Sequence, residues 1–347
     1  MDRRTTAALT AVLFVANFAF ATFSIVAYDP DTKESGVGVA SRVFAVGYIV
    51  PWAKINVGAI ATQALANIDY GVNGLELLAS GFTAQAALDS LLKADSGRDD
   101  RQVAIIDKDG QVAAYTGKGA NAWAGHRTGE YYSVQGNILV SEDVVLSMEK
   151  AFLETPGPLA RRIMSALKAG DNAGGDKRGR QSAAILVVKE KGGYQGKYDR
   201  LVDLHVDDDT AAVSELDRLY NLWESNFVVE SYLDNGGAAE TEYALMIIDR
   251  MTQEKVDNAE VYNSLAWALA TRKVMPEKAI SLALDANALA PEDTNIMDTV
   301  AEAYYSAGDY SNAVKWEQQA LKLEPTSEYL KKQLQKYKQA KSGEKTK

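Results

Sequence analysis

The amino-acid pattern changes near residues 205–209, from mixed strands and helices to helices alone, and this change limits what the chain can fold into. Before it, short strand-like runs alternate with segments whose apolar residues recur every three or four positions. After it, the strand pattern stops and the chain is helical to its end. We therefore predict two domains, for which 347 residues are sufficient.

The first part combines strands and helices. Residues 22–41 are predicted to form a hairpin, with the turn-rich stretch PDTKESG between two strands. Further strands are expected in INVGAIATQ, RQVAIIDKDGQVAAYTG and SAAILVVKE, and helices in NGLELLASGFTAQAALDSLLKAD, SEDVVLSMEKAFLE and PLARRIMSALKAG. The order strands, helix, strands, helices, strand favours an α+β domain with antiparallel sheets over a doubly wound parallel sheet.

The helical part contains an internal repeat. LAWALA, from Leu265, corresponds to VAEAYY, from Val300, at an offset of 35 residues, and each copy continues into an Ala-x6-Ala…Pro pattern. Small residues at these positions let two helices approach closely, and the proline ends each unit. The pattern is similar to tetratricopeptide repeats, so we predict a helical linker over residues 207–235 and tetratricopeptide-like repeats over residues 236–342.

Residues 1–21 have the layout of a secretory signal peptide. A short basic head is followed by an apolar run from Ala7 to Phe20, with small residues at positions 19 and 21, where signal peptidase needs them. An uncleaved membrane anchor is the alternative, but the run is shorter than the ~20 residues of a bilayer span. We expect export to the periplasm or the medium, with cleavage after Ala21 and Thr22 as the first residue of the mature chain.

Composition excludes several classes of function. The formal net charge is −10 and no basic stripe is present, which argues against binding to nucleic acid or to an anionic membrane. The chain has no cysteine, so it contains no disulfides, and it has only two histidines. Zinc sites built on cysteine or histidine clusters are therefore not expected, and we predict neither a metal nor a cofactor.

A hydroxyl residue at a new N-terminus can carry out acyl transfer. A free α-amine has a pKa of about 7.7–8.0, so the amine of Thr22 can take a proton from its own hydroxyl. One residue then supplies both nucleophile and base. The alternative is that a threonine simply follows the cleavage site.

The residues after Thr22 resemble the start of proteasomal β subunits. The order is a strand, a turn, a strand ending in Ser41-Arg42, and then Lys54 before another strand. In those subunits a lysine at the same separation favours a neutral amine and an activated hydroxyl, as a nearby positive charge should. This resemblance makes Lys54 a catalytic candidate. The chain departs from the pattern at Ala40, where those subunits carry an aspartate.

Residues 22–206 as a whole resemble a bacterial and archaeal family of N-terminal-nucleophile (Ntn) hydrolase-like proteins of unknown function. The matching motifs, in order, are TFSIVAYDP, GVGVASRVFAVGYIVPWAK, GAIATQALAN, GLELLASG, WAGHRTG, YSVQGNIL, GPLARRIMSAL and GGDKRGRQSAAILVV. The resemblance implies an αββα sandwich over these residues. Some members are also similar in carrying a C-terminal extension, either helical or of a wall-binding kind. The resemblance supplies no substrate.

Further catalytic candidates lie near predicted strand ends. Gly136 and Asn137 offer a backbone N–H and a side-chain amide, the donors that form an oxyanion hole, although a strand-end turn is equally consistent. Asp176 and Ser182 precede and begin a strand, and in Ntn hydrolases an acid and a serine at such a place orient the α-amine. The alternative is a loop aspartate and a buried serine.

Polar residues at strand ends and in a glycine-rich segment are candidates for substrate binding. Arg42 can bind a carboxylate with two hydrogen bonds, or it can brace a strand end. His126 can line a pocket, although a lone histidine is more often structural. The full set is Arg42, Thr62, Gln63, Asn67, His126 and Gln135.

Two functions from different classes fit the sequence. The first is an exported amide hydrolase in which Thr22 attacks the carbonyl carbon of a small amide or peptide-like compound. The second is a non-catalytic ligand-binding or scaffold protein of the cell envelope. In either case the repeats can bind a protein or peptide partner, pack on the first domain or mediate self-association.

Overall fold

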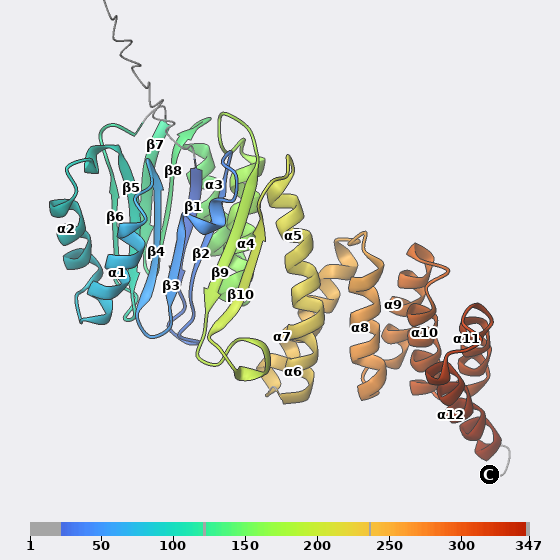
Figure 1. The fold of residues 1–347 in the computed structure, drawn as a ribbon. Coiled ribbons are helices and arrows are strands. Elements are labelled where there is room, and N and C mark those ends of the chain that lie inside the picture. Colours follow the sequence, from blue (N-terminus) through green and yellow to red (C-terminus); the bar gives the residue numbers. More distant parts are fainter. Residues whose placement is uncertain (1–21, 121–122, 236, 345–347) are drawn as a thin grey trace, which may run out of the picture. The chain divides into compact units, whose positions relative to one another are not determined.

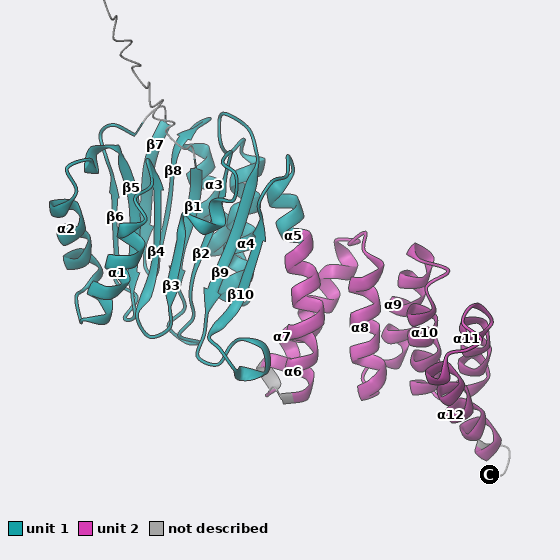
Figure 2. Ribbon diagram, viewed as in Figure 1, with its two compact units in different colours: residues 1–217 teal, residues 218–347 magenta. Residues whose placement is uncertain are grey.

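The computed structural model describes residues 22–120, 123–235 and 237–344 (Figure 1). They divide into two compact units, and the boundary in the sequence falls between Asp217 and Arg218 (Figure 2). The first unit is an α+β region with two antiparallel sheets, and the second is helical throughout. Both predictions of secondary-structure class are therefore confirmed. The signal peptide predicted for residues 1–21 lies outside the described residues.

The larger sheet of the first unit has six strands, all paired antiparallel. Strands β1 and β2 form the predicted hairpin, and both are buried along their whole length. Burial on both faces explains why their sequences contain so many valine, isoleucine and alanine residues. In sheet order the strands are β10 (Arg200–Val206), β9 (Ser182–Val188), β2 (Ser35–Ser41), β1 (Thr22–Tyr28), β8 (Tyr132–Leu139) and β7 (Trp123–Gly129).

The smaller sheet has four strands, also paired antiparallel. Apolar side chains from the two sheets, including Val26, Val39, Ala61 and Ile106, form one buried cluster between them. The strands in sheet order are β3 (Pro51–Lys54), β4 (Gly58–Ala64), β5 (Arg101–Asp107) and β6 (Val112–Thr116).

Helices lie against both sheets of the first unit. Helices α1 (Asp69–Ala79) and α2 (Ala84–Ala94) contact the smaller sheet, and α3 (Asp143–Glu154) and α4 (Leu159–Asn172) contact the larger one. Glycines in β2 let α4 approach closely, because a Cβ atom at Gly38 would lie 2.4 Å from Cγ2 of Ile163. Short 3-10 helices complete the unit at Val46–Tyr48, Arg98–Asp100 and Tyr194–Gly196.

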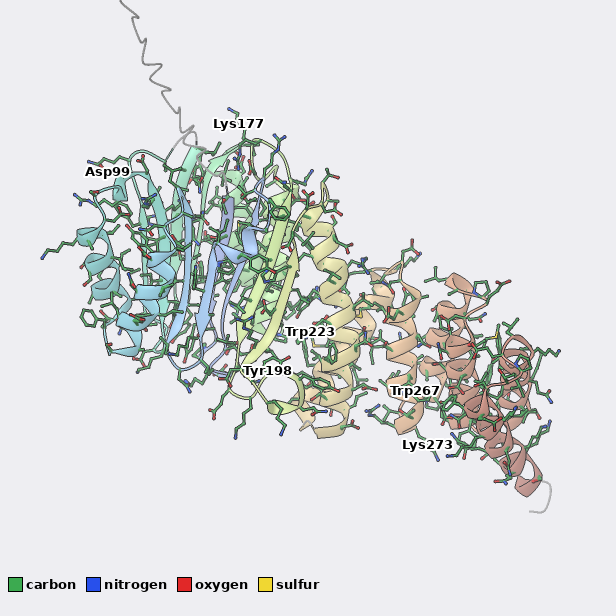
Figure 3. The ribbon with its side chains drawn as sticks, viewed as in Figure 1. Asp99, Lys177, Tyr198, Trp223, Trp267 and Lys273 are labelled. Atoms are coloured by element: carbon green, nitrogen blue, oxygen red, sulfur yellow. The ribbon has the colours of Figure 1, made fainter. Side chains whose placement is uncertain are left out.

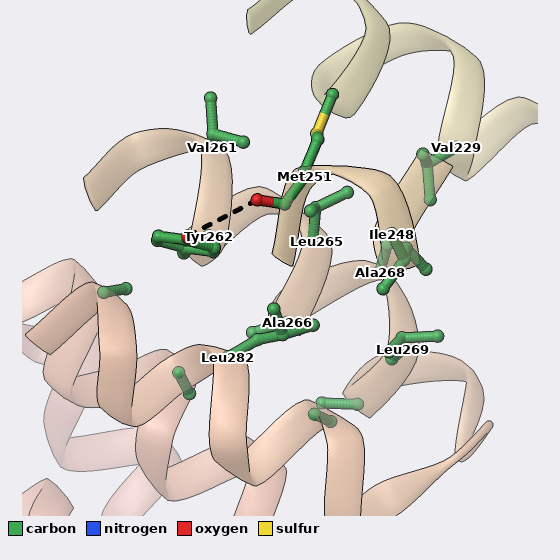
Figure 4. Packing of buried hydrophobic residues seen from close by; sticks show 14 of the residues in the cluster. Val229, Ile248, Met251, Val261, Tyr262, Leu265, Ala266, Ala268, Leu269 and Leu282 are labelled. Atoms are coloured by element: carbon green, nitrogen blue, oxygen red, sulfur yellow. Dashed lines mark hydrogen bonds between the residues drawn. The ribbon is translucent and has the colours of Figure 1, made fainter. Parts of the chain in front are cut away.

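The second unit is a series of packed helices. Helix α8 packs on α9 and α10 packs on α11. Small buried residues such as Ala266 and Ala283 allow the close approach of α8 and α9. Figure 4 shows Ala266 beside Leu282 in this cluster. Asn258, Asp293 and Asp309 cap the N-termini of three of these helices with their side chains. The elements are α5 (Ala212–Trp223, which crosses the unit boundary), a π-helix (Glu224–Val228), α6 (Val229–Asn235), α7 (Ala238–Gln253), α8 (Ala259–Arg272), α9 (Pro276–Leu289), α10 (Thr294–Ser306), α11 (Tyr310–Leu323) and α12 (Glu328–Glu344). Within the described ranges, none of the helices combines the length and the apolar character that a membrane span requires.

Candidate functional site

Four polar residues stand side by side at one end of the larger sheet. The strand register pairs Thr22 with Ser41 on one side and with Asn137 on the other, and it pairs Ser41 with Ser182. Paired residues of an antiparallel ladder point to the same face of the sheet. The side chains of Ser182, Ser41, Thr22 and Asn137 therefore form one row across β9, β2, β1 and β8, which we call the polar row.

Thr22 lies at the centre of the polar row and begins β1. Its Oγ1 atom is 3.0 Å from Oγ of Ser41, and either hydroxyl can donate the hydrogen bond. Only 1% of the Thr22 surface and 2% of the Ser41 surface are exposed. The contact is therefore shielded from water, and its geometry is fixed by the strand pairing.

Three amide side chains connect the polar row to the smaller sheet. Gln63 of β4 donates through Nε2 to the Thr22 carbonyl at 3.3 Å and to Oε1 of Gln102 at 2.7 Å. Nδ2 of Asn137 donates to the same Gln102 oxygen at 3.2 Å. Gln102 in turn donates to the carbonyl of Gly136 at 2.9 Å. These amides, which we call the amide network, hold the ends of β1 and β8 against β4 and β5.

A second set of bonds extends the amide network along β1. Ser24 donates to Oε1 of Gln63 and accepts from Nε2 of Gln135, both at 2.6 Å. Ser133 donates to Oε1 of Gln135 at 2.8 Å. All four side chains are fully buried. Interior polar groups whose bonds are satisfied in this way rigidify a site.

Asp176 lies between the ends of β2 and β8, near the start of β1. It forms an isolated antiparallel bridge with Leu139, just past Asn137 on β8, where Ile138 has a φ of 51°. Its carboxylate accepts from the backbone N–H of Arg42 at 2.7 Å and from that of Arg178 at 2.8 Å. The structure thus brings a buried carboxylate to this end of the larger sheet, and the role expected for Asp176, orientation of the α-amine, stays a prediction.

Ser182 completes the polar row on β9. Its hydroxyl accepts from the backbone N–H of Val46 at 3.1 Å and donates to the carbonyl of Val43. It therefore holds the loop that follows Ser41.

Gly136 lies inside β8, between Phe23 and Gly125. Its carbonyl oxygen accepts the hydrogen bond from Gln102.

The structure does not bring Lys54 to Thr22. Lys54 is exposed at the end of β3 and pairs with Gly58, whereas the Thr22 contact on β4 is made by Gln63. At about 3.3 Å per residue, Gly58 and Gln63 are roughly 17 Å apart along the strand. Lys54 lies far from Thr22 because of the path of the chain. Residues 42–50 connect the two sheets before β3 begins, and β3 then runs away from Thr22.

Two further candidates lie beside the site with their side chains directed elsewhere. Thr62 alternates with Gln63 along β4, so it shares the face of Ile60, which packs against α1. Its hydroxyl donates to the carbonyl of Asn67 at 3.2 Å. The Asn67 side chain accepts from the N–H of Asp69 at 3.0 Å, at the start of α1.

His126 and Arg42 lie near the polar row, His126 on β7 and Arg42 directly after β2. His126 is opposite Gln135 on β7, and its Nδ1 is 2.8 Å from Oγ1 of Thr116 on β6. Desolvation of the ring lowers the pKa of His126, which favours a neutral imidazole. Arg42 is exposed, and its guanidinium donates to the carbonyl of Arg178.

The sequence analysis missed Ser24, Gln102 and Ser133. Polar residues at alternate positions of otherwise apolar strands were the available signal, in Thr22-x-Ser24 and in Ser133-x-Gln135-x-Asn137. In the described part of the chain, no cluster of three or more histidine or acidic side chains is arranged to hold a metal ion.

The comparisons agree with this architecture. Residues 22–216, more than half of the chain, match the model of a family described as "Family of unknown function (DUF1028)". The crystal structure of protein SPO2555 from Silicibacter pomeroyi, which carries the same family model, is 30% identical, covers 60% of this chain and 89% of its own, and superimposes with a TM-score of 0.55. No curated protein matches the chain. The protein therefore belongs to the DUF1028 family, whose function is unknown.

Proposed function

We propose that this protein is an exported amide hydrolase of the Ntn type, in which Thr22 is both nucleophile and base. The proposal interprets the two sheets and their flanking helices as an αββα sandwich. One observation carries it: Thr22 begins β1 with its hydroxyl 3.0 Å from Ser41, while the carboxylate of Asp176 accepts from the N–H of Arg42, the residue after Ser41. In a chain cleaved before Thr22, we expect the new α-amine to lie near this carboxylate.

The chemistry follows from these positions. The α-amine of Thr22 takes the hydroxyl proton, and Oγ1 attacks the carbonyl carbon of the amide. The protonated amine then gives its proton to the leaving nitrogen, which departs and leaves an ester on Thr22. Water, deprotonated by the same amine, attacks this ester and releases the acid.

Asn137 is the proposed donor to the tetrahedral oxyanion. It lies directly opposite Thr22, at the roughly 5 Å between Cβ atoms that is usual for paired strands. A side-chain amide has two N–H groups. One donates to Gln102, and the other is assigned to the oxyanion.

The first test is the N-terminal sequence and intact mass of the protein exported from a bacterial host. A chain that starts at Thr22 supports the proposal. A chain that starts elsewhere, or that keeps residues 1–21, overturns it, because Thr22 then has no free amine.

The second test is acylation of the chain 22–347 by p-nitrophenyl acetate, a generic uncharged acyl donor. We expect a burst of p-nitrophenolate and one acetyl ester on Thr22, which hydroxylamine removes. Thr22→Ser retains the burst, and Thr22→Val, which keeps the shape of the side chain, abolishes it. An adduct resistant to hydroxylamine would be an amide on the α-amine and would count against a hydroxyl nucleophile.

The helices of the second unit are proposed to be tetratricopeptide-like repeats that bind a protein or peptide partner. The support is structural equivalence of the repeated alanines. Ala279 and Ala286 of α9 correspond to Ala313 and Ala320 of α11, and all four are fully buried. Binding that persists in the Thr22→Val variant would separate this role from hydrolysis.

A further inference from the structure

The segment of residues 175–178 crosses the end of β1 and connects the two strands that flank Thr22. Lys177 donates its backbone N–H to the carbonyl of Ile138 at 3.1 Å, beyond the end of the β1–β8 pairing. Asp176 accepts from the backbone N–H of Arg42, which follows β2. Figure 3 shows Lys177 at the upper end of the first unit. Arg42 and Lys177 therefore lie on opposite sides of the Thr22 position.

Two cationic side chains near this segment, Arg42 and Lys177, take no part in its ion pairs. Asp176 is paired with Arg178 at 2.9 Å, and Asp171 is paired with Arg180 at 2.6 Å. Arg42 and Lys177 are both exposed, and neither makes an ion pair with any residue in the described ranges.

The acidic residues 207–209 also lie near this end of the larger sheet. The N–H of Ala45 donates to the Asp207 carbonyl at 2.9 Å, and the N–H of Asp209 donates to the Gln181 carbonyl at 2.6 Å. One of them, Asp208, accepts a hydrogen bond from Gln181. Within the described ranges none of these acids makes an ion pair with Arg42 or Lys177, so both cations are available to an anionic ligand.

We propose that Arg42 and Lys177 form a carboxylate subsite, so that the substrate is an amide with a carboxylate near the scissile bond, of the N-acyl amino acid type. This inference rests on the proposed function. The guanidinium of Arg42 donates to the Arg178 carbonyl, which orients the group and leaves its other N–H donors for a carboxylate. Guanidinium binds carboxylate with matched geometry, and Lys177 adds a point charge.

Calorimetric titration of the chain 22–347 tests the subsite. The variant Thr22→Val is used to prevent turnover, and the probes are N-acetylglycine and the uncharged N-acetylglycinamide. We expect at least tenfold tighter binding of N-acetylglycine, with a preference that weakens as salt is raised. The double change Arg42→Gln and Lys177→Gln removes the preference, whereas Lys93→Gln, a change of an exposed lysine on α2, leaves it intact.

Each outcome has one meaning for the subsite. Equal binding of both probes, no binding of either, or a preference that survives the double change overturns it. Arg42→Lys and Lys177→Arg, which keep the charge, guard against loss through misfolding and should retain part of the preference. Acylation by p-nitrophenyl acetate reports on Thr22 alone. A preference for the carboxylate probe without acylation would reject the hydrolase and keep the subsite. Acylation without this preference would keep the hydrolase and reject the subsite.

Discussion

The hydroxyl of Thr22 lies 3.0 Å from the hydroxyl of Ser41, the residue directly opposite it in the β1–β2 ladder. The strand register, rather than a flexible loop, sets this distance. Ser41 can therefore orient the Thr22 hydroxyl and stabilise the oxygen as it loses its proton. In the proposed reaction Ser41 is a positioning residue.

Ser41→Ala is expected to slow acylation of Thr22 about fivefold, because one hydrogen bond contributes about 1 kcal/mol. The burst rate with p-nitrophenyl acetate measures the effect. The apparent pKa in the pH profile of that rate should also shift, because the hydroxyl loses a donor. Ser41→Thr keeps the hydroxyl and should restore both rate and profile. If the role of Ser41 were merely structural, Ser41→Ala would lower the unfolding free energy and leave the pH profile of acylation unchanged.

The polar row could be predicted in part from sequence. The hairpin over residues 22–41 follows from its turn and strand pattern, and it places Thr22 opposite Ser41 once the register is known. Lys54 could not be placed in this way. Its position depends on residues 42–50, which connect one sheet to the other, and no local pattern fixes the direction of that connection.

Gln102 shows a second limit of sequence analysis. At the start of RQVAIID it is typical of a polar strand end, yet it is fully buried and contacts Gln63, Asn137 and Gly136. These partners come together only when the two sheets pack, so no residue near Gln102 in the chain signals its role. The helical unit was easier to predict, because residues that recur at the repeat offset lie at contacts between helices that are neighbours in the chain.

Gln102→Leu is expected to lower the unfolding free energy of the first unit by about 3 kcal/mol or more. The change keeps the volume but leaves the buried amides of Gln63 and Asn137 without their acceptor, at about 1–3 kcal/mol for each unsatisfied group. Urea unfolding followed by fluorescence measures the loss. The matched control is Gln111→Leu, at an exposed position, where a change within about 0.5 kcal/mol is expected. Equal effects of the two variants would contradict a stabilising amide network.

Arg250→Leu is expected to destabilise the second unit by about 3–5 kcal/mol. Arg250 pairs with Glu224, which is fully buried and accepts further hydrogen bonds from Tyr220 and Tyr243. Removing the guanidinium takes the Arg250 cation away from a buried carboxylate, and adding Glu224→Gln should recover part of the loss. Thermal unfolding monitored by circular dichroism measures both variants.

The control for Arg250 is Lys278→Leu. Lys278 pairs with the exposed carboxylate of Asp249, so its loss should change stability by less than about 1 kcal/mol. Destabilisation of similar size in both variants would mean that burial of Glu224 is not the cause.

The last prediction concerns buried acids beneath α12. Glu317 of α11 is fully buried near Asp298 and Glu302 of α10, and α12 supplies Tyr329, Tyr337 and Lys336 to these acids. Burial, reinforced by the charges of Asp298 and Glu302, raises the pKa of Glu317 to about 9. Burial also raises the pKa of Asp298. At neutral pH Glu317 therefore holds a proton.

The sign of the pH effect follows from proton binding. Between pH 4.5, the ordinary pKa of the carboxyl, and about 9, folded Glu317 keeps a proton that the unfolded chain has lost. Stability is therefore fully present below this window and falls as pH rises through it, by at most about 1.4 kcal/mol per pH unit. Hydrogen exchange of α10–α12 peptides, corrected for intrinsic rates, should show opening free energies that decrease from pH 5 to pH 9.

Glu317→Gln should flatten this dependence, because the amide is uncharged in the folded and the unfolded chain at every pH of this range. The effect should be largest near pH 9, where the natural chain has two or more negative charges in a site that excludes water. Glu328→Gln makes the same chemical change at an 86% exposed side chain of α12, and it should leave the slope unchanged. If both variants keep the slope of the natural chain, Glu317 is ionised in the folded protein, and the carboxyl pair does not control the stability of this end of the helical unit.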